Sequence, residues 1–180
     1  AFSMPHRLVD AKGLNHRYRG LGLVPEFIRY GLTRGGSMAT GPYEIGGFIK
    51  SSPDADRPDM QLYFSAHSKA PGPKYTTAKY PGFTVYGQLV QATSEGSVMI
   101  TSKDPDARLA ISPNWLSTEH DRRGAVAMVR FLRTIIRQPA FAGYVGEELT
   151  PGADVVSDDA IVAAFLKGAT SGLHAVASCA

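Results

Sequence analysis

The sequence has one cysteine, Cys179, and one tryptophan, and charged residues fill only 19% of its 180 positions. A single cysteine excludes an internal disulfide framework and a zinc site built from several cysteines. No apolar run reaches the roughly 18 residues that a membrane-spanning helix needs, and the first residues lack the order of a signal peptide. We therefore expect a soluble, cytoplasmic protein that has no internal disulfide and does not span a membrane.

The charge balance also excludes several partners. Nineteen basic and sixteen acidic residues give a net charge of +3, which is too small and too scattered to indicate a polyanionic partner. Lysines and tyrosines alternate between 69 and 80, but a solvated loop has the same composition. His6, His16, His67 and His120 do not have the spacing of metal ligands, and no cluster of carboxylates accompanies them. We expect neither a nucleic-acid partner nor a metal.

A hydrophobic content of 43% is typical of one globular domain of this length. Met60, Leu62 and Phe64 alternate with Gln61, Tyr63 and Ser65, which predicts a strand with two unlike faces. Similar but weaker patterns predict further strands at 43–51, 83–91, 96–101 and 107–112.

Three helices are predicted, at 22–32, after the cap candidates Ser117 and Thr118, and from Ser157 to 168. Residues 1–19 mix charged and polar side chains, which favours irregular structure. The sequence therefore predicts an α+β fold, in which an antiparallel sheet of five to six strands is covered by helices on one face.

Two glycine motifs imitate nucleotide or nucleophile sites. Gly20-Leu21-Gly22 lacks the third glycine of a dinucleotide fingerprint, and no buried strand precedes it. The segment 35–39 resembles a nucleophile elbow only in outline. Turns explain both segments better.

His174 is the strongest candidate for chemistry. Imidazole exchanges protons near neutral pH, and the small residues that follow, Ala175, Ala177 and Ser178, leave room for a ligand or cofactor. Spacing alone still favours a structural histidine. Cys179 has no basic neighbour to favour its thiolate, so we expect it to pack rather than react.

Several stretches resemble the glucose-methanol-choline (GMC) family of flavin-dependent alcohol oxidoreductases, especially its choline-dehydrogenase-like members. The family's active-site run is histidine, proline, any residue, glycine, threonine, then cysteine or alanine. Here it stands as 174–179, with the histidine and the cysteine kept and Ala175, Ala177 and Ser178 as departures. The other similar stretches, in the family's order, are 30–36, 44–48, 58–64, 111–117 and 121–123.

The resemblance implies that 1–170 is a substrate-binding domain and that 171–180 begins the return into an FAD-binding domain that is otherwise absent from this sequence. It implies oxidation of an alcohol to a carbonyl by hydride transfer to FAD, with His174 as acid and base. Ala175 and Val176 are then expected beside the cofactor, which other polypeptide holds for the most part. The three departures affect the local backbone path more than the histidine's chemistry.

Phe48 and Phe64 could line the alcohol pocket, with core packing as the alternative for each. The expected partners are an alcohol and the FAD-binding part of the same enzyme, and we expect this chain alone to be inactive. The rival interpretation is a free-standing, non-catalytic module that binds small molecules. Choline itself is not implied, because the tyrosines cannot be assembled into a cation cage from sequence.

Overall fold

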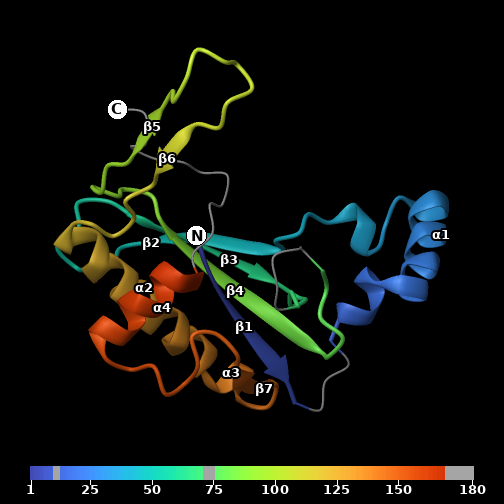
Figure 1. Cartoon of the computed structure of the whole chain (residues 1–180). Coiled ribbons are helices and arrows are strands. Elements are labelled where there is room, and N and C mark those ends of the chain that lie inside the picture. Colours follow the sequence, from blue (N-terminus) through green and yellow to red (C-terminus); the bar gives the residue numbers. More distant parts are fainter. Residues whose placement is uncertain (10–12, 71–75, 169–180) are drawn as a thin grey trace.

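The computed structural model describes residues 1–9, 13–70 and 76–168, and its centre is one five-stranded sheet (Figure 1). The strands are all antiparallel to their neighbours and follow the order β2-β3-β4-β1-β7. Their bounds are β1 Phe2–Leu8, β2 Ile45–Ile49, β3 Met60–Ser65, β4 Gly82–Leu89 and β7 Val145–Glu148. The predicted α+β fold is confirmed.

Two helices, α2 (Glu119–Ile136) and α4 (Asp158–Gly168), lie on the same side of this sheet (Figure 1). Thr118 caps α2, since its hydroxyl accepts a hydrogen bond from the backbone N–H of Asp121 at 3.3 Å. Apolar residues at helical spacing, including Met128, Val129 and Leu132, are buried against the strands. The sequence predicted both helices and the cap.

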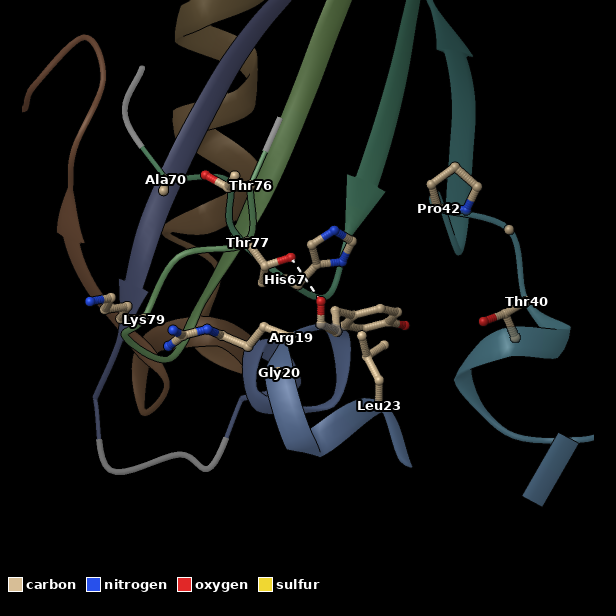
Figure 2. Close-up of a pocket in the computed structure, with 12 residues that line it drawn as sticks. Arg19, Gly20, Leu23, Thr40, Pro42, His67, Ala70, Thr76, Thr77 and Lys79 are labelled. Carbon is tan, nitrogen blue, oxygen red and sulfur yellow. Dashed lines mark hydrogen bonds between the residues drawn. The ribbon is translucent and has the colours of Figure 1, made fainter. Parts of the chain in front are cut away.

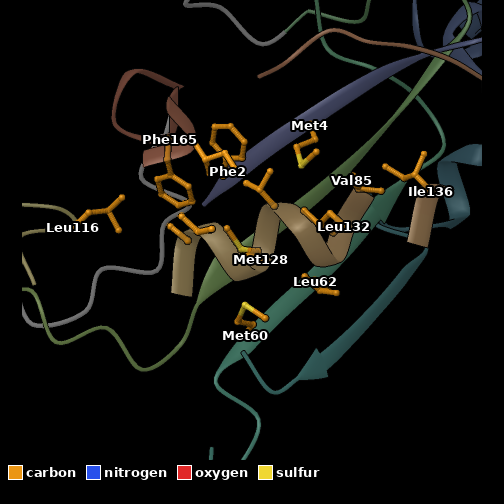
Figure 3. Packing of buried hydrophobic residues seen from close by; sticks show 14 of the residues in the cluster. Phe2, Met4, Met60, Leu62, Val85, Leu116, Met128, Leu132, Ile136 and Phe165 are labelled. Carbon is orange, nitrogen blue, oxygen red and sulfur yellow. The ribbon is translucent and has the colours of Figure 1, made fainter. Parts of the chain in front are cut away.

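The core lies between the sheet and these two helices (Figure 3). At its α4 side the rings of Phe2 and Phe165 stack with centroids 4.9 Å apart. Gly87 on β4 lies directly under Met128 of α2, and a Cβ at that position would overlap the methionine side chain. The missing side chain therefore lets α2 approach the sheet closely.

The remaining elements surround this core. Within 1–9, 13–70 and 76–168, the strands β5 (Ser97–Met99) and β6 (Ala110–Ser112) pair with each other alone, in a separate two-stranded sheet. The helix α1 (Leu23–Thr33) lies apart from α2 and α4 (Figure 1). The shorter helices are η1 (Asn15–Tyr18), η2 (Gly20–Gly22), η3 (Ser37–Ala39) and α3 (Pro139–Ala142). Within the described part of the chain, every helix is too short or too polar to cross a bilayer.

The prediction of irregular structure for residues 1–19 is wrong, because β1 occupies an inner position of the sheet. Phe2, Met4 and His6 alternate with Ser3, Pro5 and Arg7, so one side of the strand is buried although its composition is mixed. Pairing with β4 and β7 on its two sides outweighs a weak local preference.

Candidate functional site

The main sheet has one face under α2 and α4 and a second face that these helices do not cover, although Ser65, Thr84 and Gln88 on it are buried. Residues that are directly opposite in antiparallel strands point to the same face. The pairs Phe48–Gln61, Gln61–Gln88 and Tyr63–Tyr86 therefore lie on one face, opposite the face that carries Leu62 and Val85 into the core. We call the residues Phe48, Gln61, Tyr63, Tyr86 and Gln88 the open face.

Three tyrosines gather over this open face. The ring of Tyr43 lies 5.0 Å from that of Tyr63 and 5.2 Å from that of Tyr86, the latter edge-on at 78°. Both separations are typical of favourable aromatic pairs. Tyr43 comes from the segment before β2, so the cluster joins three parts of the chain on the face that also carries Phe48.

Hydrogen bonds fix the amide of Gln61 in the open face. Its side-chain oxygen accepts from the hydroxyl of Tyr63 at 2.6 Å and from the amide of Gln88 at 2.9 Å. Burial, together with nearby Tyr43, raises the pKa of Tyr63, so its hydroxyl keeps its proton at neutral pH. Since the oxygen of Gln61 is engaged twice, its NH₂ group is the part that remains to donate to a bound molecule.

A cavity of about 810 Å³ lies near the end of β3, between the start of α1 and the segments at 40–42 and 76–79 (Figure 2). His67 lines it, with its ring 4.4 Å from that of Tyr18, and its Nδ1 lies 3.0 Å from the hydroxyl of Ser65. Burial lowers the pKa of His67, an effect that nearby Glu44 partly opposes. His67 is therefore uncharged near neutral pH.

The sequence-predicted site residues fall in three places. Phe48 lies on the open face, with 61% of its surface exposed. Phe64 points to the helix-covered face, where its ring stacks on Phe83 at 5.4 Å and lies near Phe141. His174, Ala175 and Val176, like Cys179, are outside the described residues. The structure therefore does not bring Phe48 and Phe64 to one surface.

The open-face residues Gln61 and Tyr63 were not selected from the sequence, although their signal was present. The alternation along β3 separates Met60, Leu62 and Phe64 from Gln61, Tyr63 and Ser65, but it does not say which set faces the helices. The apolar set packs into the core, whereas Gln61 and Tyr63 of the polar set are half-buried on the open face and Ser65 is buried against His67.

The comparisons with known proteins identify the family of the chain. Residues 92–180 match the family model described as GMC oxidoreductase. The chain belongs to the GMC oxidoreductase family. The oxygen-dependent choline dehydrogenase of Staphylococcus xylosus is 32% identical over 151 residues, which is 82% of this chain. That of Staphylococcus aureus strain Newman is 33% identical over 143 residues, or 79% of this chain.

Solved structures of formate oxidase share the fold of this chain. A formate oxidase crystal structure superposes with a TM-score of 0.79 at 20% identity, covering 96% of this chain and 35% of that protein. A variant of the Aspergillus oryzae RIB40 formate oxidase, made to study FAD modification, gives a TM-score of 0.77. The chain spans only 25–26% of the length of the two choline dehydrogenases.

The GMC family implies a bound FAD, whose phosphates need a cradle of backbone N–H groups. Gly20-Leu21-Gly22 forms the 3-10 helix η2 rather than a turn between a buried strand and a helix. Within 1–9, 13–70 and 76–168 we therefore find no glycine cradle for the FAD phosphates at this motif. The open face, with its aromatic rings and an amide donor, is compatible with the cover of a cofactor ring and an alcohol.

Proposed function

We propose that this chain is the substrate-binding portion of an FAD-dependent enzyme that oxidises an alcohol to a carbonyl. Residues 1–170 form the cap over the substrate, and 171–180 begin the return into the FAD-binding part. The flavin supplies the hydride acceptor when it is bound, and most of its binding groups lie in other polypeptide. The chain alone is accordingly inactive, and its expected location is the cytoplasm.

The observation that carries the proposal is the asymmetry of the sheet in a chain of the GMC family. One face is closed by α2 and α4, whereas the other presents Phe48, the tyrosines and a fixed amide. Pockets for small molecules combine apolar and aromatic walls with a few oriented polar groups. The open face has this composition, and we assign the alcohol to it.

His174 has the proton-transfer role in this proposal. Oxidation of an alcohol requires loss of the hydroxyl proton as well as the hydride, and imidazole accepts a proton close to physiological pH. His174 stands at the histidine position of the family's active-site run. Ala175 and Val176 follow it, and in the proposal they lie against the cofactor.

Phe48 is the better of the two proposed substrate contacts. It is exposed and adjoins Gln61 on the open face, so it can form an apolar wall of the alcohol site. Phe64 contacts Phe83 and Phe141 on the other face, and we propose for it an indirect role through the packing of β3.

Substrates with a quaternary ammonium group form one class within this proposal. The choline dehydrogenases named above supply one reason, and the cluster of Tyr43, Tyr63 and Tyr86 supplies the other. Aromatic faces attract such cations. Choline therefore belongs in the alcohol panel, beside neutral alcohols of similar size.

The test uses the purified full-length protein. It should be yellow with the absorption bands of oxidised flavin, and these bands should disappear when an alcohol of the panel is added without oxygen. A colourless full-length protein that binds small molecules would instead support the non-catalytic module. Flavin that no alcohol in the panel reduces would contradict the proposed reaction.

A further inference from the structure

The surface of α1 is apolar where it should be polar. Leu21, Val24, Phe27, Ile28 and Leu32 are all at least half exposed, and Leu21 and Leu32 reach 88% and 81%. We call these five residues, of which Leu21 lies in η2 directly before α1, the α1 apolar surface. Single exposed apolar residues are ordinary, but five on one short helical segment form a patch that indicates an interface.

One charged side chain of the same helix, Glu26, is buried, whereas Arg29 is exposed. Glu26 is 6% exposed, and its carboxylate accepts hydrogen bonds from the backbone N–H and the hydroxyl of Ser37, at 3.0 and 2.6 Å. Arg17 lies 3.8 Å from it. The carboxylate of Glu26 is thus satisfied within the segment 15–39, while the apolar side of α1 faces outward. This is the reverse of a helix that packs on its own domain.

The segment 15–39 also carries the net charge of the chain. It contains four arginines and one glutamate, while the whole sequence has nineteen basic and sixteen acidic residues, so the rest of the chain has fifteen of each. An occupant of the α1 apolar surface should therefore be apolar at its centre and neutral or acidic at its edge.

We propose that the α1 apolar surface docks onto the FAD-binding polypeptide of the same enzyme, an inference that rests on the proposed function. The length of the relatives indicates what covers the α1 apolar surface. The choline dehydrogenases are about four times as long as the part this chain matches, so most of the enzyme is other polypeptide. The formate oxidase superposition covers 96% of the chain, so it includes most of the 25-residue segment. The segment therefore belongs to the shared fold, which favours a contact within the enzyme.

The experiment measures the accessibility of this surface in the full-length protein. Leu32→Cys on α1 and Arg123→Cys on α2 are each treated with a bulky maleimide, and mass spectrometry of the resulting peptides separates the new cysteine from all others. Arg123 is the matched control, because its side chain is 75% exposed on the other side of the molecule. We expect Leu32→Cys to react at least tenfold more slowly than Arg123→Cys in dilute monomer.

Other outcomes would overturn the proposal. Equal labelling rates would mean that nothing covers the surface. Protection that disappears on dilution to the monomer would assign the surface to a second copy, and protection that requires vesicles of anionic phospholipid would assign it to a membrane. If Leu32→Cys fails to fold, hydrogen exchange of the parent protein over 20–34 decides the same question. The flavin spectrum is read separately, so loss of the proposed activity is distinguishable from loss of this contact.

Discussion

The ion pair between Arg133 of α2 and Glu148 of β7 gives the sharpest stability prediction. Both side chains are only 8% exposed, and they meet through two hydrogen bonds, Nε to Oε2 at 3.0 Å and Nη2 to Oε1 at 2.8 Å. The guanidinium also donates to the carbonyls of Val155 and Gly152. The pair therefore holds the outer strand and the following turn onto α2.

Replacing Glu148 by Gln leaves a buried guanidinium without its counter-charge. Breaking a buried pair at one partner costs about 3–5 kcal/mol. Because the two carbonyl contacts of Arg133 remain, we expect the lower end, about 3 kcal/mol, which lowers the melting temperature of a domain this size by about 6–12 °C. The double variant Arg133→Met/Glu148→Leu removes both charges and should cost less than Glu148→Gln alone.

Urea denaturation of the chain, followed by circular dichroism, measures these differences. The matched control is Glu147→Gln, which removes the neighbouring carboxylate from an exposed pair with Arg7. It should change the free energy of unfolding by less than about 1 kcal/mol. A cost below about 1 kcal/mol for Glu148→Gln, or a double variant that is the least stable of the set, would refute the assignment of a buried charge pair.

Three further predictions follow from the two faces of the sheet and its buried histidines. Phe48→Ala should lower kcat/KM of the full-length enzyme with little change in stability. Phe64→Ala should lower the free energy of unfolding by about 3 kcal/mol, the low end for a phenylalanine, because Phe64 is only partly buried. The reverse ranking would show that the faces are misassigned. Gln61→Met should raise KM about two- to tenfold for an alcohol that accepts its hydrogen bond, and an unchanged KM would remove Gln61 from the site. Burial lowers the pKa of His6 and of His67, so each is neutral when folded and protonates more readily on unfolding. The stability that the two neutral histidines contribute to the free energy of unfolding is present above about pH 6.5 and is lost as the pH falls. The urea midpoint should therefore drop from pH 7 to pH 5, and a drop just as large in the His6→Gln/His67→Gln double variant would contradict this cause.

Much of the fold was predictable because local patterns agree with the tertiary structure there. The alternation along β3, the cap at Thr118 and the apolar stripe of α2 are each confirmed. In contrast, β1 carries Pro5, His6 and Arg7, and β7 is only four residues long. Both strands form through pairing with distant parts of the chain, which a local sequence pattern does not reveal.

The family of the chain was predictable from the sequence, whereas the arrangement of the open face was not. The run at 174–179 and the order of the other stretches indicated the GMC family, which the comparisons confirm. The tyrosine cluster could not be found in advance, because Tyr43, Tyr63 and Tyr86 meet only through the register of β2, β3 and β4. The same register separates Phe64 from Phe48.

Rapid anaerobic mixing of full-length holoprotein with its alcohol tests the central claim most directly. The variant is His174→Ala, and the matched control is His120→Ala, which removes an exposed histidine from the first turn of α2. We predict that flavin reduction slows by about a hundredfold or more in His174→Ala, as expected for loss of a general base, and stays at the parent rate in His120→Ala. Flavin reduction at the parent rate in His174→Ala would contradict the account.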